Sequence, residues 1–190
     1  MSSTIHFAGI SGSLRKGSFN TMLLNNAVQM LPEGVTMEII SISEIPIYNG
    51  DFDLPLNNAR PEPVNKFRDS IAKADALVIA SPEYNYSIPG GLKNAIDWAS
   101  RGEDSPLLHK PVALMGATPG MWGTVRMQLA FLPIFQTLGM KPVQKPEVLI
   151  ASAKTKFDEN GKLTDEKAIE LVRKKLVALK ELVEQLRTKI

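Results

Sequence analysis

Short apolar segments alternate with helical segments along the chain, and this alternation is the feature that most restricts its fold. Strand-like apolar runs occupy residues 5–10, 35–42, 76–80, 111–117 and 143–150. Helical signals cover a segment capped by Ser18 or Asn20 that ends near Leu31, then 64–73, 91–101 and 124–138, and a last segment that begins at Thr164 or Asp165. Strands that alternate with helices predict an α/β protein with a parallel sheet and helices on both faces.

The last segment shows the helical pattern most clearly. Its apolar residues recur at intervals of three or four positions: Ile169, Val172, Leu176, Leu179, Val183 and Leu186. No linker or internal repeat divides the 190 residues, which therefore predict a single domain over residues 1–190. Residues 45–62 contain several Pro, Asn and Asp residues and predict a long loop.

Cysteine is absent, and histidine occurs only twice, at His6 and His109. Without thiols the chain has no disulfides, thiolate nucleophiles or iron–sulfur ligands. Two histidines far apart in sequence also disfavour a histidine metal site or a catalytic triad. We therefore expect no metal ligand and no triad of catalytic side chains, and any redox chemistry must come from a bound cofactor.

The charge of the chain is nearly balanced, with 22 basic and 20 acidic side chains and no basic block. This balance predicts no nucleic-acid partner. No apolar run reaches the length of a membrane-spanning helix, and the N-terminus has no signal-peptide pattern. We therefore expect no membrane span and a cytoplasmic location.

Three loops follow predicted strands and should meet at one edge of the sheet. The first, SGSLRKGSFN at residues 11–20, offers hydroxyls, Arg15 and the main-chain N–H groups of a helix start. These groups suit a phosphate, and a polar turn without a ligand is the alternative. The loop is neither a Walker A loop nor a GxGxxG dinucleotide loop, and it lacks the clustered acids of a receiver domain.

The second loop, residues 81–90, combines rigid and flat side chains. Pro82 and Pro89 restrict the backbone, Tyr84 and Tyr86 are flat and amphipathic, and Asn85 both donates and accepts hydrogen bonds. This set suits a flat heteroaromatic ligand with imide groups, and a packed aromatic turn is the alternative. In the helix that follows, we expect a surface ion pair between Lys93 and Asp97, and Trp98 in the core or a subunit interface.

The third loop, within residues 116–128, contains several glycines and one hydroxyl side chain suited to ligand contact. Thr118 follows directly after the fourth predicted strand and is placed to touch a ligand. Met121 and Trp122 are large apolar residues in this Gly-rich loop. They predict either a cover over the ligand or a contact with a partner chain.

Two motifs together resemble the NAD(P)H-dependent FMN reductase family, which contains flavodoxin-like quinone, chromate and azo reductases. The motifs are GSLRKGSFN at residues 12–20 and PEYNYSIPGGLKNAIDW at residues 82–98, and the resemblance extends along almost the whole chain. It implies a flavodoxin-like three-layer sandwich with a five-stranded parallel sheet in the order 2-1-3-4-5. It also implies a homodimer or homotetramer.

The resemblance also implies a site for bound FMN. Its phosphate would contact the side chains of Ser13, Arg15, Ser18 and Asn20 and the main-chain amides of residues 14–19, which include Leu14, Lys16, Gly17 and Phe19. Its ring would lie against Pro82, Glu83, Tyr84 and Asn85, with the Glu83 side chain turned away, and Ala117 and Thr118 would complete the site. Many relatives have small hydroxyl residues at these last two positions.

The activity that the resemblance implies is hydride transfer from NAD(P)H to FMN. Two electrons would then pass to a quinone or a similar acceptor, such as chromate, an azo dye or a ferric chelate. One shared stacking site for donor and acceptor predicts ping-pong kinetics. The alternatives are a flavodoxin-type electron carrier, a class that tends to be strongly acidic, and an α/β binding protein without flavin.

Overall fold

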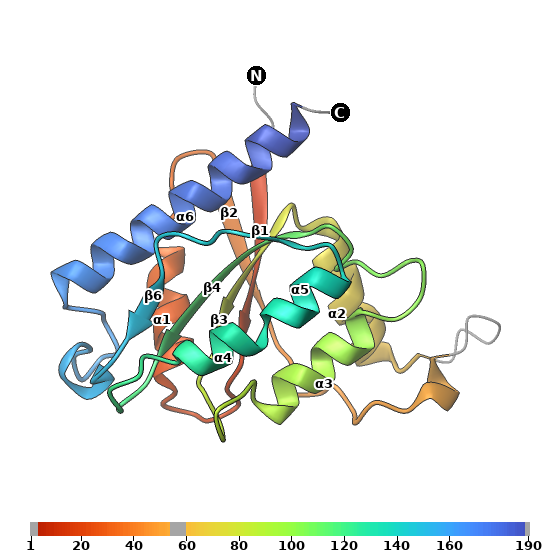
Figure 1. Ribbon diagram of the computed structural model, residues 1–190, viewed down its shortest axis with the longest axis horizontal. Coiled ribbons are helices and arrows are strands. Elements are labelled where there is room, and N and C mark those ends of the chain that lie inside the picture. Colours follow the sequence, from red (N-terminus) through yellow and green to blue (C-terminus); the bar gives the residue numbers. More distant parts are fainter. Residues whose placement is uncertain (1–3, 54–59, 189–190) are drawn as a thin grey trace.

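A parallel sheet forms the middle layer of this computed structural model, which describes residues 4–53 and 60–188 (Figure 1). Its strands are β1 (Ile5–Ser11), β2 (Val35–Ile40), β3 (Ala76–Ala80), β4 (Pro111–Ala117), β5 (Lys141–Pro142) and β6 (Val148–Ile150). They follow the order β2-β1-β3-β4-β5, and β6 also pairs with β4. All of these pairings are parallel. The α/β class and the 2-1-3-4-5 order are therefore confirmed.

Helices cover both faces of the sheet (Figure 1). One face carries α1 (Phe19–Val28) and α6 (Glu166–Arg187). The other carries α2 (Glu62–Lys73), α3 (Gly90–Ala99), α4 (Val125–Ala130) and α5 (Leu132–Thr137). Two short 3-10 helices, η1 (Gly50–Phe52) and η2 (Ala153–Thr155), lie in connections. No helix in the described part of the chain is long and apolar enough to cross a membrane.

Two buried clusters flank the sheet, because neighbouring residues of a strand face opposite sides. Phe7, Val78 and Met115 pack on the side of α1 and α6. Leu77 and Leu114 pack on the side of the other helices. Strands β3 and β4 are buried along their whole length, which explains why their sequences are continuous apolar runs.

The predicted fifth strand, 143–150, is wrong in its first half. The sheet edge here consists of the two-residue β5, which pairs with the start of β4, and of β6, which pairs with its end. Pro142 and Pro146 flank the interruption, and neither has an N–H group to donate to a ladder. Instead, Val143 O accepts a hydrogen bond of 2.6 Å from Lys175 Nζ.

The predicted helix 124–138 is divided into α4 and α5 at Phe131. Pro133 lies in the first turn of α5 and cannot donate the hydrogen bond that a continuous helix needs. The start of the last helix agrees with its prediction, since the Asp165 side chain caps α6 by accepting from Ala168 N at 2.8 Å. The first helix is capped by Ser18 and ends at Val28, before the predicted Leu31.

Part of the predicted loop 45–62 packs against α3, and its residues 54–59 lie outside the described residues. Trp98 is completely buried, which places it in the core. Its indole Nε1 donates to Pro46 O at 2.8 Å, and the Asn94 side chain donates to the same oxygen at 2.8 Å. Lys93 and Asp97 form the expected surface ion pair, at 2.6 Å.

Candidate functional site

The three loops meet at the carboxyl ends of β1, β3 and β4, along the lower edge of the view in Figure 1. Strand β2 lies on one side of β1 in the sheet, and β3 lies on the other side. The strand order therefore reverses beside β1. The first two loops touch closely: Gly12 N donates to Ala80 O at 2.8 Å. A Cβ atom on Gly12 would lie 2.3 Å from Ser81 Oγ, so only glycine fits this approach.

The first loop presents a set of free donors at the start of α1. Ser18 caps the helix by accepting from Asn20 N (3.2 Å) and Thr21 N (3.4 Å). Within the described residues, four main-chain N–H groups of the loop make no hydrogen bond within the protein: those of Leu14, Lys16, Gly17 and Phe19. The side chains of Arg15 and Lys16 are exposed, and residues 11–20 contain no carboxylate. This donor set fits a phosphate group.

Arg15 and Ser13 also shape the loop from within. Arg15 Nη2 donates to Gly17 O, which curls the loop around the basic side chain. Ser13 is mostly buried, and its hydroxyl accepts from Arg15 N at 3.4 Å. Both side chains therefore support the loop conformation in which the free N–H groups lie.

Asn20 connects the first loop to the third. Its side chain is buried and is paired with both main-chain groups of Ala117: Asn20 Nδ2 donates to Ala117 O at 2.9 Å, and Ala117 N donates to Asn20 Oδ1 at 2.8 Å. The sequence did not indicate this pairing, because the two residues are 97 positions apart. Asn20 thus has a structural role that fixes the end of β4 against α1.

The second loop is a tight two-residue turn. Tyr84 N donates to Ser87 O at 3.1 Å and Ser87 N donates to Tyr84 O at 2.9 Å. The turn residues Asn85 and Tyr86 both have positive φ, 47° and 67°. Positive φ at both central residues is typical of the type I′ turns that connect the two strands of a β-hairpin. Such a conformation is common for asparagine but unusual for tyrosine, and strained residues of this kind occur at functional sites.

The side chains of this turn are available to a ligand. Tyr84, Asn85 and Tyr86 are exposed, and within the described chain neither the Tyr84 hydroxyl nor the Asn85 amide has a hydrogen-bond partner. Pro82 is half-buried beside them. The turn therefore offers a flat ring and an amide with both donor and acceptor at the edge of the sheet.

Glu83 differs from its neighbours, because its carboxylate is directed to α4. It accepts hydrogen bonds from Arg126 Nη1 (2.9 Å), Arg126 N (2.9 Å) and Met127 N (3.2 Å). Burial by itself would raise the pKa of Glu83, but the hydrogen bonds outweigh it and lower the pKa below its ordinary value. No local sequence pattern could have found this pair, since 43 positions separate Glu83 from Arg126.

The third loop is anchored at its base and exposed at its tip. Thr118 N donates to Ile150 O, and Thr118 O accepts from Ala153 N, both at 2.9 Å. Ala117 is buried, whereas Met121 and Trp122 are 76% and 57% exposed. The base of the loop can therefore border a ligand, and its tip presents two large apolar side chains.

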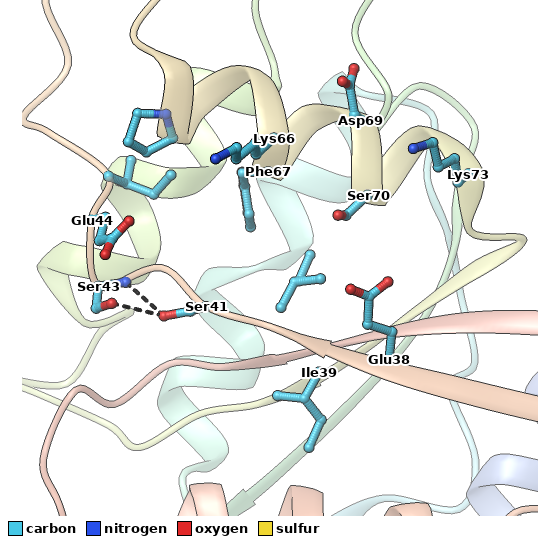
Figure 2. A pocket seen from close by; sticks show the side chains of 13 residues that line it. Glu38, Ile39, Ser41, Ser43, Glu44, Lys66, Phe67, Asp69, Ser70 and Lys73 are labelled. Atoms are coloured by element: carbon cyan, nitrogen blue, oxygen red, sulfur yellow. Dashed lines mark hydrogen bonds between the residues drawn. The ribbon is translucent and has the colours of Figure 1, made fainter.

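Outside the three loops, a groove of about 500 Å³ lies between β2 and α2 (Figure 2). Acidic and basic side chains surround it, among them Glu38, Glu44, Lys66, Asp69 and Lys73, over an apolar floor that includes Phe67. It shares no residue with the loops and takes no part in the candidate site. The described residues contain no cluster of side chains that could hold a metal ion.

A parallel sheet in this order, with a donor-rich loop after β1 and an exposed aromatic turn after β3, defines a flavodoxin-like protein. Residues 5–155 match the family model for NADPH-dependent FMN reductases. The chain therefore belongs to the NADPH-dependent FMN reductase family, as the two motifs predicted. It is an oxidoreductase of that class.

Relatives and solved structures agree with this family. The chain is 47% identical to an NAD(P)H-dependent FMN reductase of Pseudomonas aeruginosa, with 98% of this chain and 100% of the relative aligned. It is 35% identical to a quinone reductase of Escherichia coli, with the same shares covered. The solved structure of FerB, a flavoenzyme NAD(P)H:(acceptor) oxidoreductase from Paracoccus denitrificans, superimposes with a TM-score of 0.85 at 31% identity, covering 95% of this chain and 98% of FerB.

Proposed function

We propose that the protein binds FMN across the three loops, takes a hydride from NAD(P)H and passes two electrons to a quinone or a similar small acceptor. The observation that carries this proposal is the first loop, which brings free main-chain N–H groups, the Ser18 hydroxyl and the exposed Arg15 together in one short segment at the sheet edge. The family and the activities named for its relatives support the nicotinamide donor and the quinone acceptor.

The residues present fit each part of FMN. The phosphate would pair with Arg15, with the hydroxyls of Ser13 and Ser18, and with the main-chain N–H groups of Leu14, Lys16, Gly17 and Phe19. The ring would be held by Pro82, the main chain of Glu83, Tyr84 and Asn85, and the base of the third loop at Ala117 and Thr118. Asn20 contributes by holding this last segment in place.

FMN supplies the two-electron chemistry when it is bound, and the protein supplies binding and orientation. Arg15 and Lys16 balance the phosphate charge, and the Asn85 amide can hydrogen-bond the imide edge of the ring. No side chain is required as acid, base or nucleophile. Donor and acceptor use one open face in turn, which predicts ping-pong kinetics.

The decisive experiment is spectroscopic. Purified protein, or protein reconstituted with FMN, should show flavin absorbance that bleaches on mixing with NADH or NADPH in a stopped-flow instrument and returns on addition of a quinone. Chromate, an azo dye and a ferric chelate are tested as further acceptors. A protein that does not take up FMN, or a bound flavin that neither nucleotide reduces, would reject the proposal.

The proposal includes assembly into a homodimer or homotetramer and a cytoplasmic location, where reduced nicotinamide nucleotides are present. Large apolar side chains are exposed on the third loop and on α4 and α5: Met121, Leu129 and Leu132. Exposed apolar side chains that form a patch favour contact with another chain. Light scattering should give a mass at least twice the 20.8 kDa of one chain, and a monomer would reject the assembly.

A further inference from the structure

The side chain of Glu83 forms hydrogen bonds that its proposed role does not explain. In that role, only the main chain of Glu83 lines the flavin ring. Its side chain is only 12% exposed and accepts three hydrogen bonds from the first turn of α4. Because its pKa is lowered, the carboxylate is ionised at neutral pH and forms a charge-assisted pair with Arg126. This pair joins the loop after β3 to the helix that follows the loop after β4.

The carboxylate also replaces a local helix cap. The first N–H groups of a helix need acceptors, which the residue before the helix usually supplies. Here Thr124 precedes α4 in a left-handed conformation, with φ 70°, and its side chain makes no capping bond. Within the described residues its buried hydroxyl has no hydrogen-bond partner. Glu83 accepts from Arg126 N and Met127 N in its place, and so holds this strained corner.

Arg126 extends the connection to two exposed rings. Its guanidinium lies 4.0 Å from the centre of the Tyr86 ring and 4.6 Å from a ring of Trp122, both within the range of cation–π attraction. Tyr86 is 70% exposed and Trp122 is 57% exposed. The two rings come from different loops, and Arg126 is the side chain that both contact.

We propose that Glu83 is a positioning residue for substrate binding. Through Arg126 it holds Tyr86 and Trp122 as an aromatic wall beside the flavin site, and this wall receives flat rings such as nicotinamide and quinones. The inference rests on the proposed function, which supplies the flavin. Rings that are already held in place bind a flat substrate better, because fewer side-chain motions are lost on binding.

Two variants separate the parts of this arrangement. Glu83→Gln keeps the size of the side chain and removes the charge that caps α4 and pairs with Arg126. Arg126→Leu removes the cation between the rings but leaves the hydrogen bonds from the main-chain N–H groups to Glu83. Glu170→Gln is the matched control, because Glu170 forms an ion pair with Lys174 on the exposed surface of α6.

The position of the wall can be measured without flavin or turnover. Trp122 and Trp98 are the two tryptophans of the chain, and Trp98 is completely buried. Acrylamide quenching of the FMN-free protein therefore reports mainly on Trp122. We expect the quenching constant to rise clearly in Glu83→Gln and in Arg126→Leu, and to stay at the wild-type value in Glu170→Gln. Unchanged quenching in both site variants would overturn the proposal.

Kinetics of the FMN-loaded enzyme test the effect on substrates. The KM for NAD(P)H and for a quinone should rise about threefold or more in both variants, as expected for the loss of one cation–π contact. FMN affinity and kcat should change less than the KM values. Wild-type KM values, or a loss confined to FMN affinity, would overturn the proposal. If wild-type protein oxidises no NAD(P)H, the proposed function fails, and the quenching data still decide whether Glu83 holds the rings.

Discussion

Polar residues in the three loops divide into those that support the protein and those left for a ligand. Asn20 and Glu83 belong to the first kind, since their side chains are paired with Ala117 and with α4. Asn85 belongs to the second, because its exposed amide has no hydrogen-bond partner in the described chain, and Arg15 belongs to both, because it donates to Gly17 O and is exposed in a loop without carboxylates. The residues proposed to bind a cofactor and those that hold the loops in place are therefore neighbours in the same short motifs.

Arg15 is the residue whose loss should affect FMN binding most directly. Arg15→Ala should weaken FMN binding about tenfold or more, since a hydrogen bond to a charged group contributes about 1.5–3 kcal/mol. Hydride transfer per bound flavin should change less. Titration of flavin-free protein measures the first effect and stopped-flow bleaching the second. Arg173→Ala, an exposed change on α6, is the control, and equal FMN affinities would show that Arg15 is not a phosphate ligand.

Gly12 should tolerate no side chain, because its Cβ would lie 2.3 Å from Ser81 Oγ and 2.7 Å from Ser81 Cβ. Gly12→Ala must separate the first two loops, and we expect a loss of stability of about 1–3 kcal/mol together with weaker FMN binding. Urea denaturation measures the stability. At Gly90 an added Cβ meets nothing within 4 Å, so Gly90→Ala should be close to neutral. Similar losses in the two variants would contradict this explanation.

At the scale of elements, helix α6 stabilises the edge of the sheet where the strand is interrupted between β5 and β6. After Val143 N, which still donates to Val112 O of β4, the connection between β5 and β6 leaves the sheet, and Lys175 of α6 donates to Val143 O there. Lys175 is almost completely buried, and burial lowers its pKa to about 8. An amine thus replaces a strand hydrogen bond, at the cost of enclosing a charge at neutral pH.

This cost predicts a pH dependence of stability. Below pH 8 the amine is protonated in both states, but between about pH 8 and its ordinary pKa of 10.5 the unfolded chain binds more protons than the folded one. The free energy of unfolding should therefore rise through this window, by about 1–3 kcal/mol from Lys175 alone. Urea denaturation at several pH values checks this.

Two variants isolate the contribution of Lys175 from that of other groups that titrate in alkali. Lys175→Met should lack this part of the rise, whereas Lys174→Met, on the exposed side of the same helix, should keep it. The two variants would have the same pH profile if the buried amine had no part in the effect.

At the scale of the whole molecule, the sheet order brings together loops that are far apart in sequence. Because β1 lies between β2 and β3, the loop after β1 meets the loop after β3, and β4 adds the third. The two buried clusters hold helices on both faces, and the three loops lie at the carboxyl edge, outside these clusters. The candidate site is thus an open edge, not an enclosed cavity.

FMN should stabilise the entire fold, because the proposed site spans three loops of the folded state and does not exist in the unfolded chain. At a free concentration one hundred times its dissociation constant, FMN should add about 2.7 kcal/mol to the free energy of unfolding. Thermal melts with and without FMN measure this gain. Riboflavin, which lacks the phosphate, should give a smaller shift, and equal shifts would count against the phosphate loop.

The sequence by itself determined the α/β class, the family and most element positions. Apolar runs, helix caps such as Asp165 and the two motifs are local patterns, and each can be read without knowing what packs against it. The tertiary structure alone decided the partners of Asn20, Glu83 and Lys175. Those depend on hydrogen bonds between residues 32 to 97 positions apart, and such pairs form only when packing brings distant segments together.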